Sequence, residues 1–475
     1  MKKTNIILLC TLFISIATSA QKTKKSILDQ LDTQSEKYGD IAMKIWNLAE
    51  MGYLEEQSSS LLQQTLSNEG FTIKKGVANI PTAFVAEFGS GLPIIAILGE
   101  FDALPGLSQQ ALPEKKSANA EAGHACGHHL FGTASSAAAI AVKKWMQNTK
   151  QKGTIRFYGC PAEEGGGAKV YMAREGLFDD VDIALHWHPG SQNAASAAAA
   201  LANISAKFRF YGVSAHAAGA PEKGRSSLDG VEAMNAMVNM MREHVPQEAR
   251  IHYVITDGGK APNVVPDFAE VYYYSRHYSR EVVRSIFNRI VKAGEGAALG
   301  TGTTMKYEIV NGVHELLPNL TLQKLVHDNL TSIGGITYSP EEKEFADKIA
   351  LSLGQKEADI DRALSIQPYK EEARAYGSTD VGDVSFVVPT VGFGTATWVP
   401  GTSAHSWQAV AAGGTTIGEK GMMVAAKTIT ATAIDLFQNK ELIEKATLEF
   451  NNRRGKSFIY KPLLGNRPPA LDYRK

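Results

Sequence analysis

Apolar residues along the chain switch repeatedly between helical and strand spacing, in an order typical of an α/β protein. Helical spacing covers about 26–50 and 55–69. The continuous apolar run at 93–98 predicts a strand buried on both faces of a sheet. The elements expected next are an Ala-rich helix at 130–145, a strand at 154–159, a helix at 168–175 and a strand at 181–185.

The middle of the chain follows a different pattern. Alternating apolar residues at 204–210 predict a strand with one buried face. The elements expected after it are a helix at 228–244, strands at 251–256 and 268–274, a helix at 280–297 and a strand at 304–310. This β-α-β-β-α-β order is that of a ferredoxin-like module. We therefore predict an inserted domain at 203–312.

The α/β pattern resumes after this insert. It includes a helix at 341–353, a strand at 389–394 and an Ala-rich helix at 418–436, and the end after Tyr460 is expected to be an extended tail. A chain of 475 residues is too long for one hydrophobic core. We expect one catalytic α/β domain built from two parts, 24–202 and 313–475, on either side of the insert.

The first 20 residues have the pattern of a secretory signal peptide. Lys2 and Lys3 precede an apolar run at 6–16, and Thr18-Ser19-Ala20 offers small residues for cleavage. The apolar run is too short to span a bilayer. Cys10 would suit a lipoprotein, but the large Leu9 before it argues against that alternative. We expect a periplasmic or secreted protein.

Composition argues for a small-molecule partner. The 49 basic and 49 acidic residues balance, so no overall field attracts nucleic acid or anionic membranes. Beyond the signal, the only cysteines are Cys126 and Cys160. Two cysteines do not make a disulfide scaffold.

Cys126 and His128 suggest a metal site. A thiol and an imidazole are typical zinc ligands, and Gly127 between them can adopt backbone conformations that bring both to one ion. A lone Cys-x-His also occurs by chance, as a buried thiol beside histidines. The alternatives are separated by what stands elsewhere in the chain.

Acids and imidazoles follow three of the predicted strands. Asp102 comes after 93–98, Glu163 and Glu164 after 154–159, and His188 after 181–185. Open α/β sheets bind their ligands at the carboxyl ends of the strands. Of two adjacent carboxylates, one can bind a metal while the other stays free to move a proton. These positions favour a metal-dependent catalytic site.

Five motifs occur together in one order: Phe-Asp-Ala-Leu-Pro at 101–105, His-Ala-Cys-Gly-His at 124–128, Pro-Ala-Glu-Glu-Gly-Gly-Gly at 161–167, Ser-Ala-His-Ala-Ala at 214–218 and Pro-Asn-Val-Val-Pro-Asp at 262–267. With them the chain resembles the aminoacylase and glutamate carboxypeptidase superfamily of metallopeptidases, in particular its amidohydrolase branch. The resemblance implies a zinc-peptidase-like α/β catalytic domain with an inserted ferredoxin-like lid or dimerisation domain.

The resemblance also implies two divalent metal ions per subunit, Zn²⁺ or Mn²⁺, with a water or hydroxide bridging them. By motif position the ligands would be Cys126, His128, Glu164, His188 and His405. Glu163 would be the general base, and Asp102 would orient a ligand. His188 is preferred to His186 because the family's ligand precedes Pro-Gly; His186, Glu100 and His129 remain open as further contacts of the metal.

Three lid residues would bind the substrate by the same resemblance. His216 would stabilise the oxyanion, in family members from the partner subunit, and Asn263 with Arg276 would hold the substrate carboxylate. The guanidinium group of Arg is suited to this by its bidentate geometry. The remaining histidines, His244, His252, His277, His314 and His327, are expected to be structural.

The expected function is hydrolysis of the amide bond of an N-acyl or N-aroyl amino acid. The alternatives are a dipeptidase or aminoacylase acting on other N-acyl amino acids, and a non-catalytic binding protein of the same fold. An intact Glu163 argues against a pure binding protein. The expected assembly is a homodimer or a pair with a paralogous subunit, without nucleic acid and without a membrane span.

Overall fold

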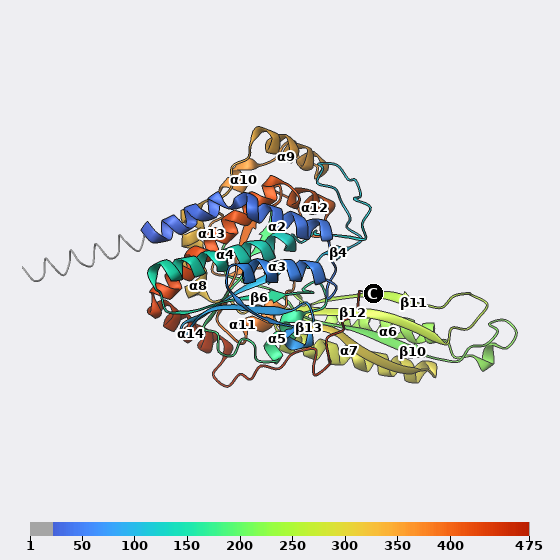
Figure 1. Cartoon of the computed structure of the whole chain (residues 1–475). Coiled ribbons are helices and arrows are strands. Elements are labelled where there is room, and N and C mark those ends of the chain that lie inside the picture. The colour runs from blue at the N-terminus through green and yellow to red at the C-terminus, as the bar shows by residue number, and fades with distance from the viewer. Residues whose placement is uncertain (1–21, 475) are drawn as a thin grey trace, which may run out of the picture.

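The computed structural model describes residues 22–474, which form a large α/β body and a smaller antiparallel sheet with two helices on it (Figure 1). The signal peptide expected at residues 1–20 lies outside the described residues. Between residues 22 and 474, no helix has both the length and the apolar character needed to cross a bilayer.

The body is built on a mixed six-stranded sheet. Its strands lie in the order β1 (Thr72–Lys75), β2 (Phe84–Ser90), β6 (Gly153–Cys160), β3 (Ile94–Glu100), β7 (Ile183–Leu185) and β15 (Thr390–Val391). β3 runs parallel to both β6 and β7, whereas β2 is antiparallel to β6. The carboxyl ends of β3, β6 and β7 therefore meet at one edge, where the predicted acids and imidazoles follow.

Both faces of this sheet are covered, which explains the continuous apolar run in β3. Ile95 and Ile97 pack into one core and Ala96 and Leu98 into another, because successive side chains of a strand point to opposite faces. The first core is formed with the helix at 22–33, α2 (Ser35–Leu48), α3 (Glu56–Asn68), α4 (His128–Thr149), α8 (Leu320–Ile333), α9 (Pro340–Ser352), α12 (Trp407–Gly413), α13 (Thr416–Gln438) and α14 (Lys440–Arg454). The second is formed with α5 (Ala168–Arg174) and α11 (Val381–Ser385).

The smaller sheet is the lid. Its elements are β10 (Ala202–Tyr211), α6 (Ser227–Met241), β11 (Arg250–Asp257), β12 (Phe268–His277), α7 (Arg280–Thr301) and β13 (Thr304–Val313). The strands lie in the order β11-β12-β10-β13, all antiparallel, and one face of the sheet packs against α6 and α7. This is the predicted ferredoxin-like arrangement, and the α/β class with an inserted lid is confirmed. The lid strands project from one side of the body (Figure 1).

Some predicted elements differ in detail. The helix expected at 26–50 is divided by a turn at Gln34, and the strand expected at 389–394 is two short strands, β15 and β16 (Gly394–Ala396). Helices α8 and α14 were not predicted. The remaining short elements are β4 (Leu104–Pro105), β5 (Ala122–Gly123), β8 (His188–Gly190), β9 (Ala198–Ala199), α10 (Ile360–Leu364) and β14 (Ala373–Arg374).

The segment after α14 connects the lid to the body. Leu463 packs into the lid core and Leu464 into the second core of the body. Arg467 donates hydrogen bonds to the carbonyl oxygens of Ile309 and Val310 on β13. Figure 1 shows the C-terminus beside β11 and β12, between lid and body. The expected tail is therefore a packed strap rather than a free end.

Candidate metal centre

The turns that follow three neighbouring strands carry most of the polar side chains of the site. Glu100 ends β3, Glu163 and Glu164 follow β6, and His188 lies shortly after β7. The Cys126 turn leads into α4. Gly127 has φ of +73°, and a Cβ there would lie 2.7 Å from Pro189, so this turn requires glycine.

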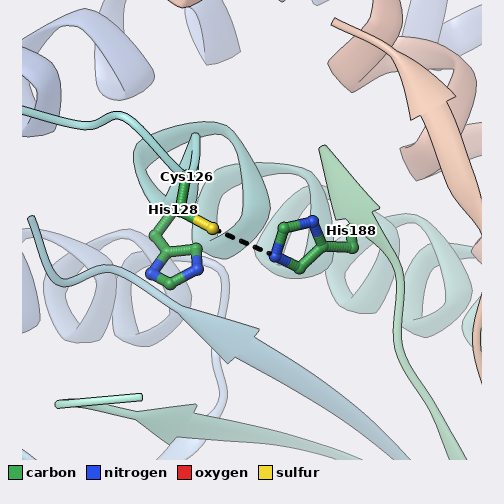
Figure 2. Close-up of side chains that lie close together, drawn as sticks. All are labelled: Cys126, His128 and His188. Carbon is green, nitrogen blue, oxygen red and sulfur yellow. Dashed lines mark hydrogen bonds between the residues drawn. The ribbon is translucent and has the colours of Figure 1, made fainter. Parts of the chain in front are cut away.

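Cys126, His128 and His188 form one cluster. Their ligand atoms all lie within 4.8 Å of one another, and Cys126 Sγ is 3.5 Å from His188 Nε2 (Figure 2). In Figure 2 the thiol and both rings point toward a common point. This is the thiolate and imidazole donor set that zinc-like ions prefer.

A second cluster contains Cys126, Glu164 and His405. Its ligand atoms also lie within 4.8 Å of one another, and Glu164 Oε1 is 3.0 Å from His405 Nε2. The His405 N–H donates a hydrogen bond of 2.9 Å to the carbonyl of Ala125, which ties this loop to the Cys126 turn. Cys126 is common to both clusters and can therefore bridge two ions.

The distances fit metal coordination. Ligand atoms about 2.0–2.3 Å from one ion are separated from each other by roughly 3–3.5 Å. The Cys126–His188 and Glu164–His405 separations lie in this range. His128 Nε2 is buried without a hydrogen-bond partner among the described residues, as a ligand atom facing an ion would be. The five predicted ligands thus come together as two sites suited to divalent ions.

Asp102 orients two of these side chains. Its Oδ1 accepts a hydrogen bond of 2.8 Å from His128 Nδ1, and its Oδ2 accepts one of 2.9 Å from the Glu164 N–H. Because a carboxylate only accepts, the His128 proton is on Nδ1 and Nε2 is left free to bind a metal. The structure places Asp102 behind the predicted ligands, as the sequence suggested.

Glu163 lies beside the clusters without belonging to the five predicted ligands. One of its oxygens groups with His128 and Glu100 within 4.8 Å. Burial, followed by the charges of Glu100 and Glu164, raises the pKa of Glu163 well above its usual value. A carboxylate with a raised pKa next to the ligands is suited to accept and return a proton.

A buried charge network that the sequence did not reveal supports the site. Lys169 on α5 places Nζ 2.7 Å from Glu100 Oε1 and 2.6 Å from Asp380 Oδ1. Burial opposes the charge on Lys169, but Asp380 and Glu100 raise its pKa well above its usual value. The sequence shows Lys169 only as one residue of a helix, because nothing local relates it to Asp380, 211 residues later.

The other nearby histidines point elsewhere. His129 Nε2 lies 2.9 Å from the Gly413 carbonyl and His124 Nε2 lies 3.0 Å from the Ile45 carbonyl. His186 packs against Gly392, and burial, followed by Lys169 and His188, lowers its pKa to about 3. In the described part of the chain, none of these three belongs to a potential metal cluster, nor do the five histidines expected to be structural.

The predicted lid residues lie apart from the clusters. His216 and Asn263 are exposed and adjacent, since the Ala217 N–H donates to the Asn263 carbonyl and His216 pairs with Val264. They belong to the loops at 212–226 and 258–267, which connect the lid strands. Arg276 on β12 is half-buried, with its guanidinium 5.2 Å from the centre of the Tyr274 ring. Within one chain, these residues are not gathered with the predicted ligands.

A cavity of 710 Å³ opens beside the first cluster. Glu100 and His188 belong to its wall, together with the aromatic side chains Phe131, Phe393 and Trp398. Polar residues including Gln323, Gln367 and Arg362 line the remainder. An apolar wall with a few polar groups is typical of a small-molecule site. Its size and aromatic lining suit an aryl or acyl group next to the metal ligands.

Comparison with known proteins connects this site to a family. The model of peptidase family M20/M25/M40 matches residues 96–408. One of the subunits of the p-aminobenzoyl-glutamate hydrolase of Escherichia coli is 40% identical over 95% of this chain and 99% of its own. The Xaa-Arg dipeptidase of Mus musculus is 28% identical over 92% of this chain and 94% of its own.

A solved structure shares the fold at low sequence identity. It is a Bacillus subtilis protein described as a dinuclear metal-binding peptidase from the M20 family, with 17% identity and a TM-score of 0.58. The similarity covers 87% of this chain and 99% of the other. The α/β body with its inserted lid is therefore a fold found among solved M20 proteins.

Proposed function

Because the chain belongs to peptidase family M20/M25/M40, we propose that it hydrolyses the amide bond joining an aroyl or acyl group to an amino acid, with p-aminobenzoyl-glutamate as the favoured substrate. The family resemblance and the hydrolase class expected from the motifs are confirmed. The observation that carries the proposal is the convergence of Cys126, His128, Glu164, His188 and His405, with Glu163 left unused beside them.

Two findings support this substrate. The relative that shares 40% identity over nearly the whole chain is named for hydrolysis of p-aminobenzoyl-glutamate. The cavity beside His188 has the aromatic wall that an aminobenzoyl ring would contact. A dipeptidase acting on other N-acyl amino acids is the second candidate, because the Xaa-Arg dipeptidase is also similar over most of its length.

The side chains define the chemistry. When bound in the two clusters, divalent ions would polarise the scissile carbonyl and make water acidic enough to ionise near pH ~7. Cys126, His128 and His188 would hold one ion, and Cys126, Glu164 and His405 the other. Glu163 takes the proton of the attacking water and transfers it to the nitrogen of the departing amino acid. Asp102 keeps His128 and Glu164 in position meanwhile.

We propose that the active unit contains two subunits. His216 and Asn263 lie in loops between lid strands, apart from the clusters of their own chain. A second subunit, identical or paralogous, could bring these loops to the site, with His216 placed to stabilise the oxyanion and Asn263 with Arg276 placed to bind the substrate carboxylate. The Escherichia coli relative is itself named as one subunit of its enzyme.

Export and metal identity are also proposals. The charged start, apolar run and small residues at 1–20 support secretion to the periplasm or outside. The mixed sulfur, nitrogen and oxygen donors suit zinc and also admit manganese. Metal analysis of protein purified from its native compartment would decide both.

The test is hydrolysis of p-aminobenzoyl-glutamate by the chain without residues 1–20, reconstituted separately with zinc and with manganese. Glu163→Gln is the matched variant, because it removes the base and none of the five predicted ligands. We expect turnover in the parent and a loss of at least a hundredfold in the variant, with the metal content unchanged.

Two other results would redirect the proposal. Turnover of Xaa-Arg dipeptides but not of p-aminobenzoyl-glutamate would favour the second candidate. Binding of metal and substrate without turnover of any N-acyl amino acid, including after addition of a paralogous subunit, would favour a non-catalytic binding protein. Equal activity in Glu163→Gln would overturn the assigned base.

A further inference from the structure

Glu100 presents one carboxylate oxygen to the metal centre without a partner. The side chain is only 1% exposed and ends β3. Oε1 is paired with Lys169 at 2.7 Å, whereas Oε2 has no hydrogen-bond partner among the described residues. Oε2 lies instead 3.1 Å from His128 Nε2, which is equally unpartnered. Buried polar atoms normally have partners, so this pair of atoms requires an explanation.

The proton on His128 makes the contact more specific. Its Nδ1 donates to Asp102, which leaves a lone pair on Nε2. Nε2 and Glu100 Oε2 are then two acceptors facing each other at 3.1 Å, an arrangement that is repulsive unless a cation binds both. Two ligands of one ion, each about 2.0–2.2 Å from it, are about 3 Å apart. The observed distance fits a shared ion.

We propose that Glu100 is a further ligand of the ion held by Cys126, His128 and His188, and that Lys169 is the positioning residue that holds Glu100 in place. This inference rests on the metal centre of the proposed function. It adds an oxygen donor to a sulfur and nitrogen set, and so makes that position harder than a Cys-His-His site. Manganese should therefore bind better than it would without Glu100.

Lys169 has the contacts that such a role needs. It is fully buried, and Asp380 fixes it twice, through Nζ at 2.6 Å and through the backbone N–H at 3.0 Å. Nζ occupies Oε1 of Glu100 and leaves only Oε2 to face the cluster. One ammonium between two carboxylates leaves one net negative charge, which a divalent ion can offset. The network thus keeps Glu100 ionised and correctly turned.

The experiment measures metal binding without substrate. In a His405→Ala background, which disables the second cluster, the apoprotein is titrated with Mn²⁺ and with Co²⁺. Glu100→Gln should weaken Mn²⁺ binding at least tenfold, and Lys169→Met should weaken it about 10–100-fold. Asp383→Asn is the matched control, because Asp383 is buried on α11 beside Asp380 but faces Tyr460 and the His314 N–H. It should leave metal affinity unchanged.

The visible spectrum of bound Co²⁺ provides a second measurement. With Glu100 bound, the background protein should show the weak bands of a five- or six-coordinate ion, and Glu100→Gln should show the stronger bands of a four-coordinate one. Should a variant fail to fold, the spectrum of the background protein decides alone: strong four-coordinate bands there overturn the proposal.

Unchanged affinity and spectrum in Glu100→Gln would also overturn it, and would make Glu100 only a counter-ion of Lys169. The failure of the proposed function would look different, because then the unmodified chain would bind no ion or would bind ions without hydrolysing N-acyl amino acids.

Discussion

Asp102 and His128 form a buried pair in which Oδ1 lies 2.8 Å from Nδ1. The same carboxylate accepts the Glu164 N–H through its other oxygen. One side chain therefore orients a ligand from each cluster, His128 for the first and Glu164 for the second. The two proposed metal positions are linked through Asp102 as well as through Cys126.

Asp102→Asn should weaken binding of both ions. The amide keeps the size of the carboxylate but loses the negative charge, and only one of its two polar groups can accept a hydrogen bond. We expect metal affinity to fall about 10–100-fold, the cost typical of groups that orient metal ligands. Competition with a chelator, measured by metal analysis after dialysis, gives the affinity. Retention of both ions at the parent affinity would contradict this role.

The two cysteines should behave differently on substitution. Cys126 belongs to both clusters, whereas Cys160 is buried at the end of β6 and lies 3.3 Å from the Tyr158 carbonyl. Cys126→Ser should therefore reduce the metal content of both sites and abolish turnover. Cys160→Ser is the matched control and should keep two ions per chain. If the loss of metal were confined to one ion in Cys126→Ser, the bridging assignment would be wrong.

Much of this site could be predicted from sequence because its residues follow apolar strands. Parallel strands bring their carboxyl ends together, so Asp102, Glu164 and His188 had to meet once β3, β6 and β7 were recognised. The ferredoxin-like lid was predictable for a similar reason, since the order of its elements is characteristic.

The parts that sequence did not reveal depend on contacts between distant segments. Lys169 and Asp380 are 211 positions apart, and the packing of the chain end on the Glu164 turn spans more than 300. Neither pair carries a local pattern. Helices α8 and α14 were missed, although the chain buries part of each against the first core. Tertiary packing rather than a strong local signal defines them.

The end of the C-terminal segment should stabilise the turn that carries the catalytic carboxylates. Tyr473 Oη and an Arg474 N–H both donate to the Glu164 carbonyl, at 3.0 and 2.7 Å. Removing both donors in Tyr473→Phe with Arg474→Met leaves this oxygen without them, which should lower the free energy of unfolding by about 1–3 kcal/mol. Urea denaturation of the single and double variants measures the effect.

Tyr376→Phe is the matched control for that prediction, because Tyr376 is 74% exposed. It should leave the unfolding free energy unchanged within about 0.5 kcal/mol. Because both donors share one acceptor, the double variant should lose more than the two single variants together. Simple additivity would mean that the two contacts do not act on the same carbonyl.

His314 should make the protein less stable in acid. It is 1% exposed, and burial followed by the nearby Arg280 lowers its pKa to about 3, although Nε2 lies 3.0 Å from the Lys461 carbonyl. The ring lies among Phe386, Phe458 and Tyr460. Its environment therefore favours the neutral form, whereas in the unfolded chain a histidine takes up a proton below pH ~6.5.

The sign follows from this difference. Between pH ~6.5 and the folded pKa, the unfolded state binds one more proton, so the free energy of unfolding falls as the pH falls. At pH 5.5 the loss from His314 should be about 1.4 kcal/mol relative to pH 7.5. Asp383, whose pKa burial raises to about 7, has the opposite slope, but it is present in every variant compared and cancels.

His314→Gln tests this dependence, because an amide can still donate to Lys461 and does not titrate. Urea denaturation at pH 7.5 and 5.5 should show a loss on acidification that is about 1.4 kcal/mol smaller in His314→Gln than in the parent. His244→Gln, at an exposed position, is the matched control and should follow the parent. Equal acid sensitivity in the parent and His314→Gln would show that His314 becomes charged in the folded protein, and its packing among three aromatic rings would then have to open to admit water.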